Sequence, residues 1–192
     1  MRKKSPALGS HAAVNQSKTA DNKTLRFDLT VIAGIVLLGS ILYSNTLHVP
    51  WYMDDINNIL DNQAVHSLGE AWQALFTSAR GFVNLTFAVN YALGGDNVVG
   101  FHVVNIAIHL LTSCLVFLLL KRVFRRNGLF AVGGALIFLA HPLQTQAVTY
   151  IVQRATGLAA LFFSWPSIYT REPGRQQRSN RNDIGCFTSA PS

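Results

Sequence analysis

The chain has 192 residues, of which 49% are hydrophobic and only 13% are charged, and its formal net charge is +7. A soluble domain of this length rarely combines so much apolar content with so few charges. The basic residues flank the apolar runs instead of alternating with aromatic residues, so the positive charge does not indicate a nucleic-acid partner. The composition therefore favours an integral membrane protein.

Residues 1–28 form a polar segment at the start of the chain. They include six Lys or Arg residues and few large apolar ones. A segment of this composition buries too little apolar surface to fold alone. We predict a disordered cytoplasmic tail over 1–28.

The first long apolar run covers residues 29–47 and contains no charge over 19 positions. About 20 apolar residues are needed to cross a bilayer. A cleaved signal peptide is the alternative, but the run begins late, is long, and is not followed by a small-x-small cleavage pattern. We predict a retained transmembrane helix that ends before Pro50.

Residues 48–100 form a long loop with one basic residue, Arg80, and five acidic residues. By contrast, 1–28 holds six Lys or Arg residues and 121–128 holds four. The positive-inside rule therefore places the N-terminus in the cytoplasm and this loop outside.

The loop is too long and too apolar for a simple disordered connection. Its apolar residues recur at helical spacing, which predicts one amphipathic helix on the membrane surface. A second helix is expected over 83–93, closed by Gly94 and Gly95. The residues of the first apolar face are Leu68, Trp72, Leu75 and Phe76.

Two adjacent carboxylates, Asp54 and Asp55, follow the first span where membrane gives way to water. Asp55 precedes a short apolar stretch and is a candidate helix cap. The alternative is catalysis, because a carboxylate near a low-dielectric boundary holds a proton more tightly and serves as a base. The residues alone leave both roles open.

The second apolar run, 101–120, carries polar side chains on one helical face. His102, Asn105 and His109 are spaced at i, i+3 and i+7, and such groups face the interior of a membrane bundle. His102 lies near the outer end, within reach of an active site. His109 is deeper and is expected to form an interhelical hydrogen bond.

Two further spans are predicted over about 128–141 and 147–163. The second has Arg154 in its middle, which is costly in a membrane without an anion or a watery cavity, so Arg154 is a site candidate. His141 lies between the two spans on the external side. Together the four spans predict an all-α polytopic membrane helical bundle with amphipathic interfacial helices in the first external loop.

Residues 164–192 contain no Leu or Val but four Arg and three Pro. This composition predicts a disordered cytoplasmic tail. The abrupt change near Phe163 leads to the hypothesis of a truncation or a reading-frame shift. The two cysteines, Cys114 and Cys186, and the histidines show no metal-binding spacing, so no metal site is predicted.

Several separated motifs resemble the N-terminal part of membrane glycosyltransferases of the GT-C type, in particular the transmembrane, tetratricopeptide-repeat O-mannosyltransferases and their bacterial counterparts. The resemblance covers about residues 29–163. The motifs are 52–55 (YMDD), 84–95 (NLTFAVNYALGG), 100–105 (GFHVVN), 109–110 (HL), 141–148 (HPLQTQAV), Arg154 and 158–163 (LAALFF).

The resemblance implies a GT-C fold that moves a mannose-like sugar from a polyprenyl-phosphate donor to a protein hydroxyl or another acceptor. It implies that Asp54 is the catalytic base and Asp55 its capping or orienting neighbour. The implied substrate ligands are Arg80, His102, His141 and Arg154, with Arg154 foremost for the phosphate. The implied partners are membrane lipid, the lipid-linked sugar and an acceptor protein or glycan, in the bacterial inner membrane or the endoplasmic reticulum membrane. The dependence on a divalent metal is left open.

Two departures from the family pattern stand out. The chain has Arg80-Gly81 where the family commonly has Arg-Pro, which we expect to change only loop stiffness. It has Gln146 where a glutamate is frequent, which removes a possible acid or base. Since such enzymes have many more spans and a repeat domain, we expect this chain to be inactive alone. The alternative is a non-enzymatic small membrane protein or degenerate fragment that acts only by helix packing.

Overall fold

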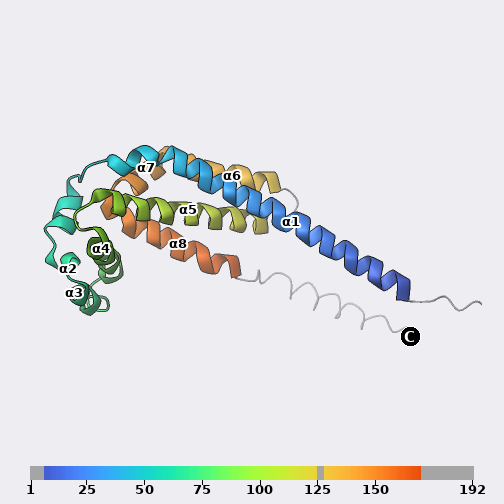
Figure 1. Ribbon diagram of the computed structural model, residues 1–192, viewed down its shortest axis with the longest axis horizontal. Coiled ribbons are helices and arrows are strands. Elements are labelled where there is room, and N and C mark those ends of the chain that lie inside the picture. The colour runs from blue at the N-terminus through green and yellow to red at the C-terminus, as the bar shows by residue number, and fades with distance from the viewer. Residues whose placement is uncertain (1–6, 125–127, 170–192) are drawn as a thin grey trace, which may run out of the picture.

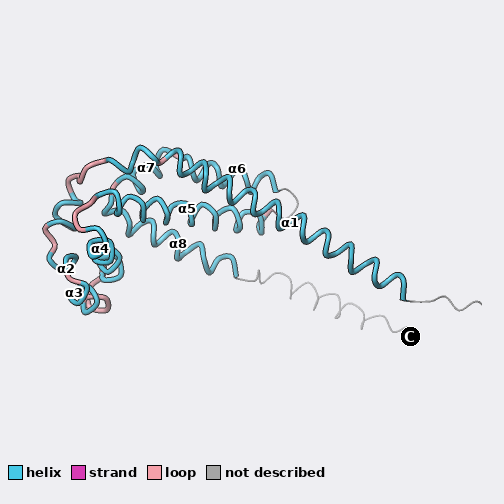
Figure 2. The backbone as a smooth tube through the Cα atoms, viewed as in Figure 1, coloured by secondary structure: helices cyan, strands magenta, loops and turns pink. Residues whose placement is uncertain are grey.

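The computed structural model describes residues 7–124 and 128–169. Within these ranges the secondary structure is helical and contains no strand (Figures 1 and 2). This confirms the predicted all-α membrane bundle. The elements are α1 (Ala7–Leu42), η1 (Ser44–His48), η2 (Ile56–Leu60), α2 (Gln63–His66), α3 (Leu68–Gln73), α4 (Gly81–Gly94), α5 (Val98–Val123), α6 (Gly128–Ala140), α7 (Pro142–Thr149), η3 (Ile151–Gln153) and α8 (Arg154–Tyr169).

The long helices lie side by side around α5. Helices α6 and α8 pack along α5, and α1 contacts both α5 and α6. The short helices α2, α3 and α4 gather at one end of this bundle, on the left of Figure 1. That end, which we call the loop end, also receives the start of α5 and of α8.

Among the described residues, two helices are long and apolar enough to cross a membrane: the Asn22–Leu42 part of α1, and α5. Helices α6 and α7 provide a third span if the bend of 54° between them lies within one crossing. The bend occurs at Pro142, whose fixed φ suits the first turn of a helix but not its interior.

The structure corrects the predicted fourth span over 147–163. Helix α7 ends at Thr149, Tyr150 is extended, and α8 begins at Arg154, so the arginine lies at the start of a helix and not in its middle. The Asn105 side-chain amide donates to the carbonyls of Tyr150 and Ile151, at 3.3 Å each. These bonds satisfy backbone groups that the break leaves without helical partners.

Both predicted tails are partly helical. Helix α1 extends back to Ala7, so residues 7–28 continue the first span instead of being disordered. No proline occurs between Ala7 and Leu42, and the Ala, Lys and Gln residues there favour a helix once a neighbouring span nucleates it. Helix α8 passes Phe163 and ends at Tyr169. The rest of the two predicted tails lies outside the described residues.

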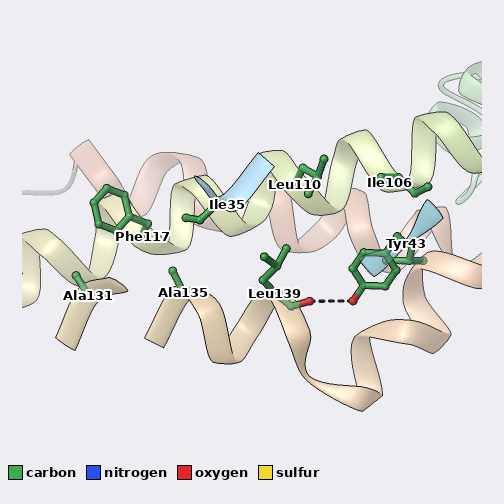
Figure 3. Close-up of a cluster of buried hydrophobic side chains, with 9 residues drawn as sticks. Ile35, Tyr43, Ile106, Leu110, Phe117, Ala131, Ala135 and Leu139 are labelled. Carbon is green, nitrogen blue, oxygen red and sulfur yellow. Dashed lines mark hydrogen bonds between the residues drawn. The ribbon is translucent and has the colours of Figure 1, made fainter. Parts of the chain in front are cut away.

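The main core of the bundle lies between α1, α5 and α6 (Figure 3). Ala131 and Ala135 of α6 are fully buried, which lets the helices approach closely, as membrane helix contacts require. The Tyr43 hydroxyl donates to the carbonyl of Leu139 at 2.9 Å. Figure 3 shows this bond at the end of the apolar cluster, where it ties α1 to α6.

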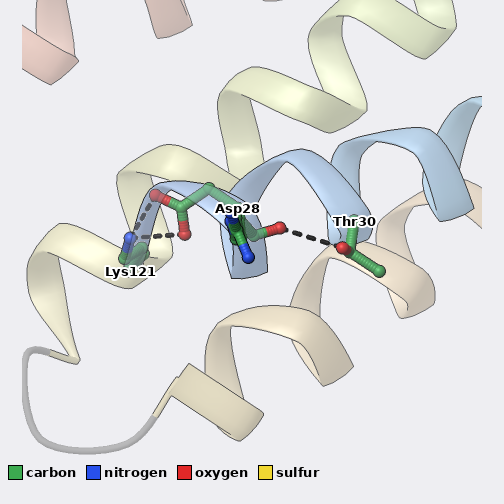
Figure 4. Close-up of polar contacts among 4 residues, drawn as sticks. Asp28, Thr30 and Lys121 are labelled. Atoms are coloured by element: carbon green, nitrogen blue, oxygen red, sulfur yellow. Dashed lines mark hydrogen bonds and ion pairs between the residues drawn. The ribbon is translucent and has the colours of Figure 1, made fainter. Parts of the chain in front are cut away.

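An ion pair joins α1 and α5 at the end of the bundle away from the loop end. Lys121 of α5 contacts both carboxylate oxygens of Asp28 of α1 (Figure 4). Both side chains are partly exposed, so the pair lies where a bilayer surface would meet the helices. It accounts for the acidic residue that precedes the first apolar run.

The two helices predicted in the loop are present as α3 and α4. Helix α4 ends at Gly94, and Gly95 follows with φ of 58°, the left-handed conformation that glycine adopts at a helix end. Helix α3 is shorter than the apolar pattern indicates and ends at Gln73. Trp72 and Phe76 are 62% and 89% exposed, so these large apolar side chains point away from the protein.

Candidate functional site

The two adjacent aspartates lie in opposite environments. Asp54 is exposed, whereas Asp55 is only 1% exposed. The preceding residue, Met53, has φ of 38°, in the left-handed region that residues other than glycine seldom occupy. The chain therefore turns sharply just before Asp54, and such backbone strain is concentrated at functional sites.

Asp55 caps a helix that is distant in sequence. Its Oδ1 accepts a hydrogen bond from the Val152 N–H at 2.7 Å, across 97 positions. Val152 belongs to η3, which leads directly into α8, and N–H groups at a helix start lack internal partners and favour a negative charge. Its own element η2 receives no side-chain cap from Asp55. Capping is thus the role that the structure gives Asp55, with a partner that sequence spacing does not indicate.

His102 is fully buried beside the start of the loop. Its Nε2 lies 2.9 Å from the carbonyl oxygen of Val49, so Nε2 carries the proton and donates. Within the described residues, its Nδ1 is the one buried side-chain nitrogen or oxygen without a hydrogen-bond partner. His102 therefore fixes the segment that leads from η1 to Trp51, and it is not open to solvent.

Arg154 is the largest fully buried side chain of the described chain, at 1% exposure. Its Nε donates to Asn105 Oδ1 at 2.8 Å, and its Nη1 donates to Asn90 Oδ1 at 2.8 Å. The Thr86 carbonyl accepts from Nη1 at 3.2 Å, and the Phe101 carbonyl accepts from Nη2 at 3.1 Å. The guanidinium thus joins α4, α5 and α8.

Every one of these acceptors is neutral. The guanidinium carbon also lies 4.5 Å from the centre of the Phe87 ring, whose electron-rich face attracts a cation. Among the described residues no carboxylate pairs with Arg154. The two asparagine amides direct their oxygens to Arg154, while their nitrogens donate to backbone carbonyls, Gly100 in the case of Asn90. Each of the three guanidinium nitrogens therefore has a neutral hydrogen-bond partner.

Arg154 also borders a cavity of about 120 Å³ between α5, α7 and α8. Gly157 of α8 is one of the residues that line this cavity. It lies so close to α5 that a Cβ there would be 3.2 Å from Ile108. The polar residues lining it are Asn105, His109, Thr112, Gln144, Arg154 and Thr156.

Arg80 is exposed, and one residue, Asn58, links it to the segment that carries Asp54. Its Nη1 donates to Asn58 Oδ1 at 3.3 Å, and the Asn58 Nδ2 donates to the Asp54 carbonyl at 2.7 Å. Asp54, Asn58 and Arg80 form what we call the surface cluster. It combines a carboxylate with a guanidinium at the loop end.

Gly81, directly after Arg80, is buried against the end of the preceding turn. A Cβ at this position would lie 2.3 Å from the Ala74 carbonyl oxygen and 2.6 Å from that of Leu75. These are backbone atoms and cannot rotate away. A proline would place carbon in the same space, so the Arg80-Gly81 departure changes the packing of the loop and not only its stiffness.

The remaining predicted residues have local roles. His141 is exposed at the start of α7, and its Nδ1 accepts the Leu143 N–H at 3.2 Å. His109 donates from Nε2 to the Leu139 carbonyl at 3.2 Å, which is the predicted interhelical bond. Gln146 is exposed. Within the described residues no group of three or more His, Cys, Asp or Glu side chains is placed to hold a metal ion.

The structure thus divides the predicted site into two groups. Apart from His141, which is exposed at the start of α7, Asp54 and Arg80 are exposed and linked through Asn58, whereas Asp55, His102 and Arg154 are buried. Sequence reasoning missed Asn58, Asn90 and Thr86. A signal for the last two exists, since Thr86 and Asn90 are four apart in an otherwise apolar helix and share one face.

Comparison with known proteins gives a consistent set of relatives. Over 162 residues the chain is 31% identical to human protein O-mannosyl-transferase TMTC3, a match that covers 77% of this chain and 17% of that protein. It is 34% identical to human TMTC2 over 140 residues, 66% of this chain and 17% of that protein. It is 32% identical to Tmtc1 of Drosophila melanogaster over 143 residues, 67% of this chain and 16% of that protein.

No protein-family model matches the chain, and no solved structure matches it. The chain spans about one sixth of the length of the curated relatives it matches. The relatives are all protein O-mannosyl-transferases by name, and the structure has helices long and apolar enough to span a membrane, as the resemblance implies. The chain is therefore a homologue of the protein O-mannosyl-transferases over two thirds or more of its own length.

Proposed function

We propose that this chain is part of an integral membrane glycosyltransferase that moves a mannose-like sugar from a polyprenyl-phosphate donor to a protein hydroxyl or another acceptor. The names of its relatives support the class of reaction. The surface cluster supports the loop end as the place where this reaction occurs. We infer that this loop end faces outside and the N-terminus the cytoplasm, from the distribution of basic residues.

The observation that carries the proposal is the difference between the two aspartates. Asp54 is open to a substrate, whereas Asp55 is buried and bound to the Val152 N–H. A general base must reach the proton that it removes, so Asp54 is the base and Asp55 holds the segment beneath it.

The reaction requires one bond to form and one to break at the anomeric carbon of the sugar. The acceptor hydroxyl oxygen attacks this carbon, its proton passes to the Asp54 carboxylate, and the bond to the phosphate oxygen breaks. The electron pair leaves with the polyprenyl phosphate. Positive charge near that phosphate lowers the barrier, because negative charge develops on it in the transition state.

Arg80 is the arginine best placed to bind this phosphate. It is exposed, and its guanidinium donates a hydrogen bond to Asn58. Arg154, the ligand favoured by sequence alone, is buried, and each of its three guanidinium nitrogens already donates to a neutral partner. We therefore assign the phosphate to Arg80 and a structural role to Arg154.

Donor binding by the purified chain tests this proposal. The chain is reconstituted in phosphatidylcholine vesicles that contain radiolabelled polyprenyl-phosphate mannose. The amount of donor that stays bound to the chain is then measured. We expect saturable binding that Arg80→Ala weakens by roughly tenfold, as for a charged hydrogen bond. Lys23→Ala, an exposed charge elsewhere on the chain, is the control and leaves binding unchanged.

Asp54→Asn separates binding from chemistry. We expect it to bind the donor normally, because the base acts on the acceptor. The chain alone is expected to show little transfer, so turnover is measured on a full-length relative. An absence of saturable donor binding would contradict the proposal and favour a protein that acts only by helix packing.

A further inference from the structure

We propose that Asn58 and Gly81 are positioning residues that hold Arg80 beside the Asp54 segment. Neither residue touches the reacting atoms. Each acts through Arg80, one by a hydrogen bond and the other by its lack of a side chain. The use of this arrangement in donor binding rests on the proposed function, whereas the positioning of Arg80 is testable without that function.

Asn58 is suited to this role because it uses both ends of its amide. Its oxygen accepts from Arg80 Nη1 at 3.3 Å, and its nitrogen donates to the Asp54 carbonyl at 2.7 Å. An exposed arginine has many rotamers, and a fixed acceptor reduces the entropy lost when a ligand later binds. Asn58 thus links the cation to the backbone that carries the carboxylate.

Gly81 determines where the Arg80 backbone lies. Its N–H donates to the Ser78 carbonyl at 3.0 Å, which closes the turn after α3. The same turn brings the Ala74 and Leu75 carbonyl oxygens so near Gly81 that a Cβ would lie within 2.6 Å of both. Any larger residue forces the turn apart, and Arg80 moves with it.

Trypsin cleavage after Arg80 can be used to measure how firmly this arrangement is held. It is the only Lys or Arg between His48 and Gly100, so trypsin cleaves this loop at one site. Proteases cut extended backbone, and a folded segment must open before it is cleaved. The rate of cleavage after Arg80 therefore reports how firmly the surface cluster is held.

The test compares matched pairs of variants in detergent micelles, with the peptide ending at Arg80 quantified by mass spectrometry. Asn58→Ala is paired with Asn57→Ala, an exposed asparagine of the same element. Gly81→Ala is paired with Gly94→Ala of the same helix, where a Cβ meets no described atom within 4 Å. The cleavage rate of each variant is divided by the rate of the same variant unfolded in denaturant. This ratio removes the effect of the substitution on trypsin's own sequence preference.

We expect Asn58→Ala and Gly81→Ala to be cleaved roughly tenfold faster, and both controls at the rate of the unaltered chain. Asn58→Asp keeps an oxygen for Arg80 but loses the donor to the Asp54 carbonyl, so it restores slow cleavage only in part. Cleavage of Asn58→Ala and Gly81→Ala at the unaltered rate would overturn the proposal. Asn58→Ala keeps the test valid if Gly81→Ala does not fold.

Donor binding distinguishes this proposal from the proposed function. A positioning role predicts that Asn58→Ala weakens binding of polyprenyl-phosphate mannose while the midpoint of thermal unfolding is unchanged, and that Asn58→Asp recovers binding in part. If cleavage accelerates but the unaltered chain binds no donor, the positioning of Arg80 stands and the assigned reaction fails.

Discussion

At the scale of single residues, the structure separates charge that is used for packing from charge that is open to a ligand. Arg154 and Asp55 are both about 1% exposed, yet they are not paired with each other by any described contact. Each instead satisfies neutral backbone or amide groups. A buried charge of this kind is tolerated because several hydrogen bonds replace its lost hydration.

Replacing Arg154 should therefore disrupt the fold more than any surface arginine. Arg154→Lys keeps the charge but cannot reach Asn90, Asn105 and Phe101 together, since lysine lacks the planar fork. We expect a loss of about 1–3 kcal/mol of unfolding free energy for each acceptor left without a donor. Thermal unfolding in detergent measures this, and Arg80→Lys serves as control. Equal stability of the two variants would contradict the assigned role.

Asp55 gives a second prediction at this scale. Asp55→Ala removes the acceptor of the Val152 N–H and leaves the start of η3 without its cap. We expect a loss of about 1.5–3 kcal/mol, typical of a hydrogen bond to a charged group. Chemical denaturation compared with Asp54→Ala measures the difference, and Asp54→Ala should be close to neutral. An equal effect of the two substitutions would show that Asp55 is not a cap.

At the scale of elements, apolar runs and glycines predicted most of the helices, while breaks that depend on distant partners were not predictable. The run 101–120 lies within α5, and Gly94-Gly95 closes α4 as expected. The break at Tyr150 was missed because its carbonyl is satisfied by Asn105, from another helix. Hydrophobic periodicity carries no information about such a bond.

Helix packing gives a prediction for two glycines of α1. A Cβ at Gly39 would meet side-chain atoms of Leu110 at 2.2 Å and Leu139 at 2.9 Å, whereas Gly34 has no described atom within 4 Å. Gly39→Val should therefore cost about 1–3 kcal/mol through overpacking. Gly34→Val should be nearly neutral. Thermal unfolding of both variants tests this, and similar midpoints would argue against the close contact of α1 with α5 and α6.

At the scale of the whole molecule, the class of protein was predictable from composition, but the division of the site into two layers was not. The adjacent Asp54 and Asp55 look equivalent in sequence. The contact of Asp55 with Val152 of η3 joins one of them to a distant part of the chain, while the other stays exposed. Neighbouring helices likewise give each guanidinium nitrogen of Arg154 a neutral acceptor, although sequence alone marks this residue as the phosphate ligand.

Membrane orientation is testable with single cysteines. In a chain with both natural cysteines replaced by serine, Thr77→Cys lies at the loop end and Val123→Cys at the other end, and both positions are exposed. For the chain expressed in the bacterial inner membrane, the positive-inside rule predicts that an impermeant maleimide labels Thr77→Cys in intact cells, and Val123→Cys only after permeabilisation. The reverse pattern would invert the proposed topology.

The most direct test of the central claim uses a full-length relative, human protein O-mannosyl-transferase TMTC3. The aspartates that align with Asp54 and Asp55 are each changed to asparagine, and mannose transfer and the amount of folded protein are measured. The account predicts that the first change abolishes transfer with the folded amount unchanged, whereas the second lowers the folded amount. Transfer that persists after the first change would contradict the assignment of Asp54 as the base.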